Sequence, residues 1–206
     1  MNNGISILGG EFELLRVTPD LYNEAEEILT DLSVNEEFLC LCANLKESPQ
    51  AIEELRTLIR HILSCGISFV IRQVKSGKIA AALTSIIFNY KKDSIYFHLM
   101  DQFKSPNMVR YRQLMNAIEN SFDMYKEWQV DNILEVEYMG TLPEFRGRGL
   151  ASILTQYIIS FGKLMSQGNL PPEVFSQLSS EMQLHKTSSA GNDNNVETKL
   201  KEKVWG

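Results

Sequence analysis

The sequence predicts an α/β fold in which helices flank one sheet. Segments typical of strands alternate along the chain with segments whose apolar residues recur every three or four positions. The clearest case is a strand at 132–142, which leads through a glycine-rich turn into a long amphipathic helix. The length of 206 residues suits one domain, and we expect a single domain over 1–206.

The composition is that of an ordinary globular protein. Hydrophobic residues make up 44% of the chain and charged residues 22%, which excludes the disordered and membrane-embedded classes. The net charge of −6 and the lack of a long basic run argue against nucleic acid as a partner. The acidic N-terminal segment argues against a signal peptide, and no stretch is apolar enough to span a membrane, so we expect a cytoplasmic protein without a membrane partner.

The cysteines do not form a metal-binding or redox pattern. Cys40, Cys42 and Cys65 lack the paired spacing of zinc and thioredoxin-like sites. We interpret them as reduced structural thiols and expect no bound metal.

The N-terminal part predicts a strand and two helices. A strand at Phe12–Val17 comes first, and Pro19 opens a helix that runs to about Leu32. Pro49 lies at the start of a second helix whose apolar residues form one stripe, and Gly66 ends it.

A hairpin follows the second helix. The segments 67–74 and 79–90 are rich in β-branched and aromatic residues, and the turn 75–78 joins them. We therefore expect an antiparallel pair of strands.

The next segments predict a helix, a strand and a second helix. Apolar residues at helical spacing predict a helix from about Met108 to Trp128. A strand at 132–142 follows, with Gly140 as the expected position of a bulge. From Leu150 to Met165 the apolar residues fit one helical face without a miss.

The turn at 146–151 has a composition suited to binding an anion. Gly147 and Gly149 allow a tight turn, and the first N–H groups of the following helix have no partner within the helix. Arg146 and Arg148 can add charge-assisted hydrogen bonds to a pyrophosphate. The plainer alternative is a tight connection between strand and helix. A Rossmann site would need a different glycine pattern after a first strand.

The same turn carries a resemblance to a known family. Arg-x-x-Gly-x-Ala at 146–151, between a strand and a long helix, resembles the acetyl-coenzyme A (acetyl-CoA) signature of the GNAT superfamily of N-acetyltransferases. The segment from Ile133 to Thr141, followed by Pro143, is similar to the central strand and loop of insect arylalkylamine N-acetyltransferases. The resemblance implies the GNAT fold, with a mixed central sheet, acetyl-CoA as co-substrate and a small arylalkylamine as substrate.

The resemblance also implies roles for individual residues. The edge of the central strand pairs with the pantetheine arm in such proteins, a role that falls here on Met139, Gly140 and Thr141. The implied pyrophosphate-binding residues are Arg146, Gly147, Arg148, Gly149, Leu150 and Ala151. The bulge is expected to leave a backbone N–H available for the thioester oxyanion.

A general base is expected after the first helix. The run Asn35-Glu36-Glu37-Phe38 resembles an Asp-Glu-Pro-Leu motif in which the family's glutamate acts as base, which implies Glu36 as the catalytic residue. A solvated surface glutamate is the alternative. Glu135 and Glu137 are reserve candidates, against the simpler interpretation that they form the polar side of a strand.

The sequence departs from the family in two places. Gly140 stands where some members have a serine, which removes any hydroxyl role. The pattern of the last two family strands is missing, so we expect a shortened C-terminus, with 168–206 weakly ordered or degenerate. Only Ser188 and Ser189 remain there as weak candidates for protonating the leaving thiolate. The alternative function is therefore a catalytically impaired, regulatory acyl-CoA-binding paralogue or truncated isoform.

Overall fold

A computed structural model describes residues 4–64, 67–89 and 95–168 of the chain. The chain divides into two compact units, residues 1–154 and 155–206. Helix α7 (Leu150–Ser166) begins in the first unit and continues into the second, as the apolar periodicity predicted. The expected degeneracy of the C-terminal segment and the missing strands concern residues outside the described part, apart from Gly168.

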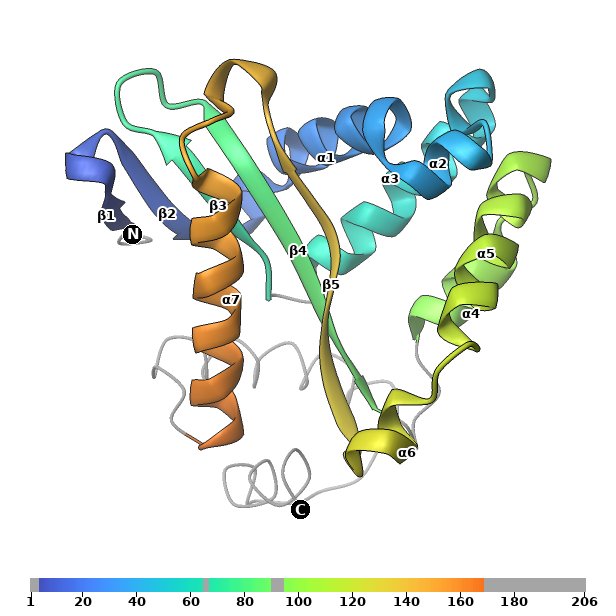
Figure 1. The fold of residues 1–206 in the computed structure, drawn as a ribbon. Helices are drawn as coiled ribbons and strands as arrows, with labels where there is room; N and C mark the ends of the chain where they lie inside the picture. Colours follow the sequence, from blue (N-terminus) through green and yellow to red (C-terminus); the bar gives the residue numbers. More distant parts are fainter. Residues whose placement is uncertain (1–3, 65–66, 90–94, 169–206) are drawn as a thin grey trace, which may run out of the picture. The chain divides into compact units, whose positions relative to one another are not determined.

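The first unit contains a five-stranded sheet whose order follows the sequence (Figure 1). Its strands are β1 (Ile5–Ile7), β2 (Phe12–Arg16), β3 (Phe69–Gln73), β4 (Ile79–Asn89) and β5 (Asn132–Thr141). Each strand pairs with the next in the antiparallel sense. The α/β class and the predicted hairpin of β3 and β4 are confirmed, and β1 is an addition.

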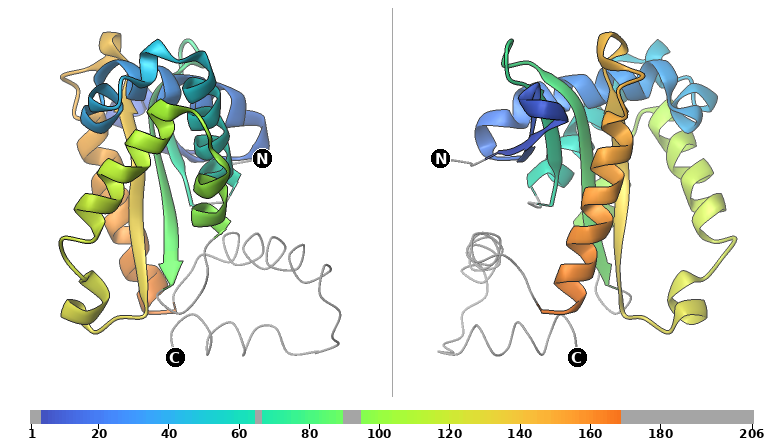
Figure 2. Two further views of the ribbon diagram at one scale, coloured as in Figure 1. Left: turned by 90° about the vertical axis from the view of Figure 1, so that its right-hand side faces the viewer. Right: turned by 60° about the vertical axis from the view of Figure 1, so that its left-hand side comes forward.

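The helices of this unit pack beside the sheet. They are α1 (Tyr22–Glu36), α2 (Phe38–Cys42), α3 (Pro49–Ser64), α4 (Ile95–Gln102), α5 (Pro106–Glu119) and α6 (Met124–Trp128). Helices α1 and α3 contact β4, and α4 and α5 contact α3 (Figures 1 and 2). No helix in the described ranges is long and apolar enough to cross a membrane.

The core of the unit lies between these helices and the sheet. Leu29 of α1, Leu55 and Ile59 of α3 and Ala82 of β4 are at most 1% exposed. Burying a leucine or isoleucine side chain stabilises a fold by about 1.5–3 kcal/mol. The buried apolar residues of α3 therefore stabilise the packing of the helices on the sheet. The hydroxyl of Ser48 accepts a hydrogen bond from the Ala51 N–H at 3.2 Å and caps α3.

The predicted helix from Met108 to Trp128 is wrong as a single element. The structure ends α5 at Glu119 and starts α6 at Met124. Asp123 causes the new start, because its carboxylate accepts a hydrogen bond from the Lys126 N–H at 3.0 Å. A short polar side chain that binds the backbone favours a cap over a helix interior.

The bulge of β5 lies at Glu137. Thr84 of β4 is opposite Tyr138 and Ser85 is opposite Val136, so Glu137 is the extra residue. The buried Thr84 hydroxyl accepts a hydrogen bond from the Tyr138 N–H at 3.1 Å and donates to the Tyr138 carbonyl at 3.3 Å. A side chain thus bonds to both backbone groups of the residue that follows the bulge.

The expected bulge at Gly140 is therefore wrong. Gly140 pairs in register with Ala82. Its lack of a side chain serves a different purpose, because a Cβ atom there would lie 2.4 Å from Cδ1 of Leu32 on α1. Gly140 allows α1 to approach β5 closely.

Candidate functional site

A cavity of about 550 Å³ opens in the first unit, where α1, β5 and the start of α7 meet. Its walls include Leu32, Ser33 and Glu36 of α1, and the β5 segment from Glu137 to Thr141. The turn before α7 contributes Phe145, Arg146, Gly147 and Gly149, and the helix contributes Leu150, Ala151 and Ser152. The cavity thus combines the glycine turn with glutamates far away in the sequence.

The glycine turn presents bare backbone to this cavity. A 3₁₀ turn at Pro143–Phe145 follows β5, and Gly147 and Gly149 both have a φ of 76°. A Cβ atom at either glycine would meet no atom within 4 Å, so no side chain fills the space beside them. Because α7 begins at Leu150, its first N–H groups lie at the same point. This is the geometry of a helix N-terminus that receives a phosphate or another anion.

Arg146 connects the turn to the end of α1. One guanidinium nitrogen donates to both carboxylate oxygens of Glu36, at 2.7 and 2.8 Å, and Nε donates to the Thr141 carbonyl at 3.0 Å. The Arg146 and Glu36 side chains are 46% and 49% exposed, so the ion pair adds at most about 1 kcal/mol of stability. It matters more for position, since it holds Glu36 at the rim of the cavity.

Arg148 faces away from this arrangement. Its guanidinium forms an ion pair with Glu11 and lies 5.5 Å from the ring centroid of Phe12. The Phe12 ring in turn contacts Phe145 edge-on, with centroids 6.0 Å apart. Arg148 is the only predicted cofactor-binding residue that does not line the cavity.

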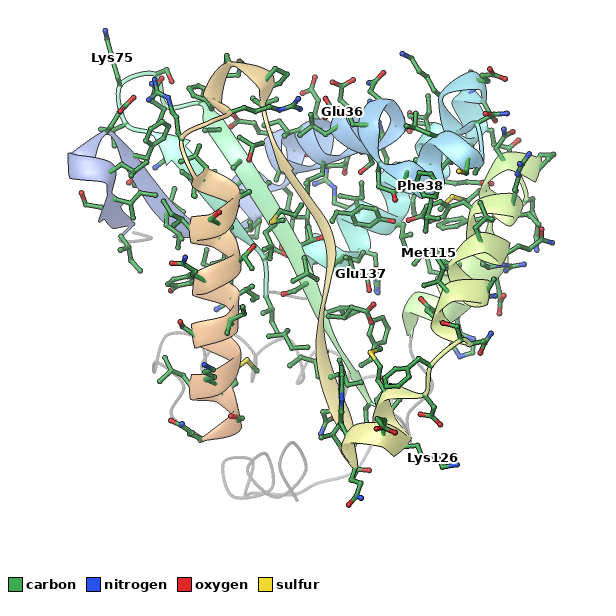
Figure 3. All side chains as sticks on the ribbon, in the orientation of Figure 1. Glu36, Phe38, Lys75, Met115, Lys126 and Glu137 are labelled. Carbon is green, nitrogen blue, oxygen red and sulfur yellow. The ribbon has the colours of Figure 1, made fainter. Side chains whose placement is uncertain are left out.

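The two reserve glutamates of β5 have different surroundings. Glu137, the bulge residue, lines the cavity together with Glu36 (Figure 3). Glu135 lies outside its lining, and burial, followed by the charge of Glu119, raises the pKa of Glu135. Of the two reserve candidates, Glu137 therefore lies at the cavity and Glu135 does not.

Glu37 and Tyr138 also line the cavity, and the sequence offered no signal for either. The Tyr138 hydroxyl lies 3.1 Å from the Tyr111 hydroxyl, and burial raises the pKa of Tyr111. Burial and a hydrogen bond with Glu37 raise the pKa of the Cys40 thiol, which keeps it protonated. Cys40 and Cys42 are free thiols, and no group of metal-binding side chains occurs within the described ranges.

The register of β5 determines which of its backbone groups face β4. The Leu142 N–H donates to the Ala80 carbonyl at 2.9 Å, and the Tyr138 N–H donates toward β4 as well. Alternation along the strand then directs the peptide groups of Gly140 toward β4, and those of Met139 and Thr141 to the opposite edge. The Tyr138 N–H is engaged by Thr84 and is therefore not the expected oxyanion donor.

Comparison with known proteins identifies the fold. The sequence matches no protein-family model and no curated protein. The structure is similar to a putative arylalkylamine N-acetyltransferase 7 of the yellow fever mosquito Aedes aegypti, with 17% identity, 70% of this chain covered and a TM-score of 0.60. The match spans 59% of that protein's length. A mosquito arylalkylamine N-acetyltransferase-like 5b matches with 15% identity over 75% of this chain and 72% of its own, with a TM-score of 0.64.

This chain has the GNAT fold. A Drosophila melanogaster polyamine N-acetyltransferase that forms N-acetylagmatine shares it, with 18% identity, coverage of 75% and 71% of the two chains, and a TM-score of 0.61. The predicted fold is thus confirmed. Within the GNAT fold, the cavity lies where β5, with its bulge, runs into the glycine turn.

Proposed function

We propose that this chain is an N-acetyltransferase that moves an acetyl group from acetyl-CoA to the primary amine of a small arylalkylamine. One observation carries the proposal: a single cavity joins the anion-binding turn at Gly147 and Gly149 to the carboxylates of Glu36 and Glu137. The turn suits the pyrophosphate of CoA, because its bare backbone and the start of α7 meet there. The edge of β5 at Met139 and Thr141 suits the pantetheine arm.

The reaction requires few groups from the protein. The amine nitrogen attacks the thioester carbon, the C–S bond breaks, and the thiolate leaves with the electron pair. The proton that the new amide nitrogen then loses converts the thiolate to the free thiol of CoA. The ammonium form of the acceptor must first lose a proton to a base, directly or through a water. Glu36 is the proposed base, and Glu137 is the alternative, since both carboxylates line the cavity.

Charge favours a cationic acceptor. Glu36 and Glu137 contribute their carboxylates to the lining, whereas Arg146 is the only lysine or arginine among the described residues that line the cavity. Such an excess of negative charge attracts protonated amines and raises their local concentration. Binding also places the ammonium group beside the carboxylates that accept its proton.

The choice of an arylalkylamine as acceptor is supported by the apolar part of the cavity lining and by the names of the similar structures. Leu32, Tyr138, Met139, Phe145 and Leu150 give the cavity an apolar side suited to an aromatic ring. Three of the similar structures bear arylalkylamine N-acetyltransferase names, and two others bear the names of a polyamine and an agmatine N-acetyltransferase. A polyamine is therefore the competing acceptor.

The deciding experiment measures thiol release from acetyl-CoA by the purified chain. The acceptor panel contains tyramine, tryptamine, agmatine and putrescine, and calorimetry of CoA binding uses the same sample. We expect turnover with the two arylalkylamines and binding of CoA. Higher kcat/KM with agmatine or putrescine would replace the arylalkylamine by a polyamine acceptor.

Two further results would reject the proposal. CoA binding without turnover on the whole panel would favour the non-catalytic acyl-CoA-binding paralogue. Loss of both, in a sample shown by circular dichroism to be folded, would mean that the glycine turn does not bind CoA.

A further inference from the structure

We propose that Glu37 is a positioning residue that holds the base Glu36 in the cavity by joining α1 to α2 without a linker. The inference rests on the proposed function, because Glu36 has the role of base only in that reaction. Glu37 has no counterpart in the motif from which Glu36 was predicted, where a proline occupies this place.

Glu37 closes one helix with its backbone. Its N–H donates to the Ser33 carbonyl at 3.0 Å, which completes the last turn of α1. Its own φ of −73° and ψ of 131° are extended, so the chain leaves the helical path at this residue. Glu36 is therefore the last helical residue of α1, one bond away from the change in direction.

Glu37 opens the next helix with its side chain. One carboxylate oxygen accepts a hydrogen bond from the Leu39 N–H at 2.9 Å, and the other accepts from the Cys40 N–H at 2.6 Å. These are the N–H groups that the first turn of α2 leaves without helical partners. The Glu37 carbonyl accepts from the Leu41 N–H at 3.0 Å, so the whole residue is committed to the junction.

The far end of α2 is fixed as well. The Asn107 side chain, on α5, donates to the carbonyls of Ala43 and Asn44, both at 3.0 Å. With α2 held at both ends, the direction in which α1 ends is determined, and Glu36 stays beside Arg146 and the cavity. Loss of the Glu37 cap releases only the end that carries Glu36.

The test separates the cap from the charge of Glu37. Glu37→Ala removes both, Glu37→Asn keeps a capping oxygen without the charge, and Glu37→Asp keeps both. We expect Glu37→Ala to lower kcat by about 10- to 100-fold, because small displacements of a reacting group have effects of this order. We expect Glu37→Asn and Glu37→Asp to retain kcat within about threefold of wild type, since Asn and Asp are good caps.

A matched control removes an equivalent cap elsewhere. Asp123 caps α6, which like α2 has five residues, and lies outside the cavity lining. We expect Asp123→Ala and Glu37→Ala to lower the melting temperature by a similar amount, about 2–4 °C, whereas only Glu37→Ala lowers kcat. An equal loss of kcat in Asp123→Ala would reduce Glu37 to an ordinary structural cap.

A double mutant shows whether Glu37 acts through Glu36. In the Glu36→Ala background, Glu37→Ala should reduce kcat by less than about twofold, because the group to be positioned is gone. A full further loss there would overturn the proposal. So would unchanged kcat in Glu37→Ala, or a Glu37→Asn variant as impaired as Glu37→Ala, which would assign the effect to charge.

Amide hydrogen exchange tests the cap formed by Glu37 without depending on the proposed enzymatic activity. Glu37→Ala should speed exchange at Leu39 and Cys40, and Glu37→Asp should restore the slow rate. If the wild type turns over no amine, the proposed function fails, and the positioning of Glu36 as a base fails with it. If the wild type is active and exchange in Glu37→Ala is unchanged, only the inference about Glu37 fails.

Discussion

The two sides of the cavity are built in different ways. The turn side, from Gly147 to Leu150, is continuous in sequence and exposes backbone groups. The opposite side combines α1 and the bulge of β5, and presents the side chains of Glu36 and Glu137. A site built from backbone groups can be recognised in the sequence by its glycines and by the start of a helix. A site built from side chains that are distant in sequence can be recognised only in the folded structure. The comparison predicts that mutations on the turn side affect binding, and that mutations on the other side affect turnover.

Removal of the proposed base should have the largest effect. Glu36→Ala should lower kcat by about 10²- to 10⁴-fold, the range for loss of a general base, with little change in the Kd of CoA. Steady-state kinetics and calorimetry measure the two quantities. Glu27→Ala is the control, since Glu27 is an exposed residue of the same helix.

The same assay on Glu137→Ala distinguishes the two glutamates. If Glu36→Ala keeps wild-type turnover and Glu137→Ala loses it, Glu137 is the base. If Glu36→Ala instead weakens CoA binding as much as it lowers turnover, the division between the two sides fails.

The next largest effect is expected on the turn side. Gly149→Ala should weaken CoA binding by about tenfold, because the methyl group projects into open space beside the turn and the φ of 76° strains any residue other than glycine. Gly77→Ala provides a matched control, since Gly77 has a φ of 72° in the turn between β3 and β4, outside the cavity lining. Calorimetry should show an unchanged Kd for Gly77→Ala. Equal Kd values for both variants would remove the turn from CoA binding.

A smaller effect is expected within the opposite side, where α1 contacts β5. Gly140→Ala places a Cβ atom against Leu32, so α1 and β5 must separate or Leu32 must rotate. We expect a loss of about 1–2 kcal/mol in the free energy of unfolding, measured by urea denaturation. The double variant Leu32→Ala and Gly140→Ala should lose less than the sum of the single variants. If the losses in unfolding free energy of the two single variants simply add, the contact between Gly140 and Leu32 does not determine the spacing of α1 and β5.

The smallest effect concerns a glutamate outside the cavity. Burial, and then the Glu119 charge, raises the pKa of Glu135. The folded protein therefore binds this proton more tightly than the unfolded chain, and stability falls as the pH rises from the ordinary glutamate range through the raised pKa. Glu135→Gln should raise the melting temperature at pH 7 by about 1–2 °C, and the gain should shrink near pH 4. The exposed Glu127→Gln is the control, and a gain independent of pH would contradict the assignment.

The sequence predicted the turn side of the cavity well, for a physical reason. Gly147, Gly149 and the apolar stripe of α7 express backbone geometry and helical periodicity, which are local properties. All the predicted cofactor-binding residues except Arg148 line the cavity. Nothing in the local sequence indicates that Glu11 lies within reach of Arg148.

The other side was less predictable because its contacts are distant in sequence. Glu36 and Arg146 are 110 residues apart, and no spacing rule connects them. Helix α2 was missed, because the apolar run Phe38–Cys42 is too short to show a helical period and Glu37 is an uncommon cap. The bulge was expected at Gly140, since glycine is the usual signal, yet the structure has it at Glu137, next to a residue held by Thr84.

The role of Thr84 limits how this cavity can be redesigned. A valine at position 84 has nearly the same shape, but it offers no oxygen to the Tyr138 N–H and no proton to the Tyr138 carbonyl. The Tyr138 N–H and carbonyl would lose these two hydrogen bonds, which would weaken the bulged pairing relative to a register shifted by one residue. Such a slip would turn the side chains beyond the bulge to the opposite face. Engineering of acceptor specificity on β5 should therefore treat Thr84 as part of the cavity, although it lies outside the lining.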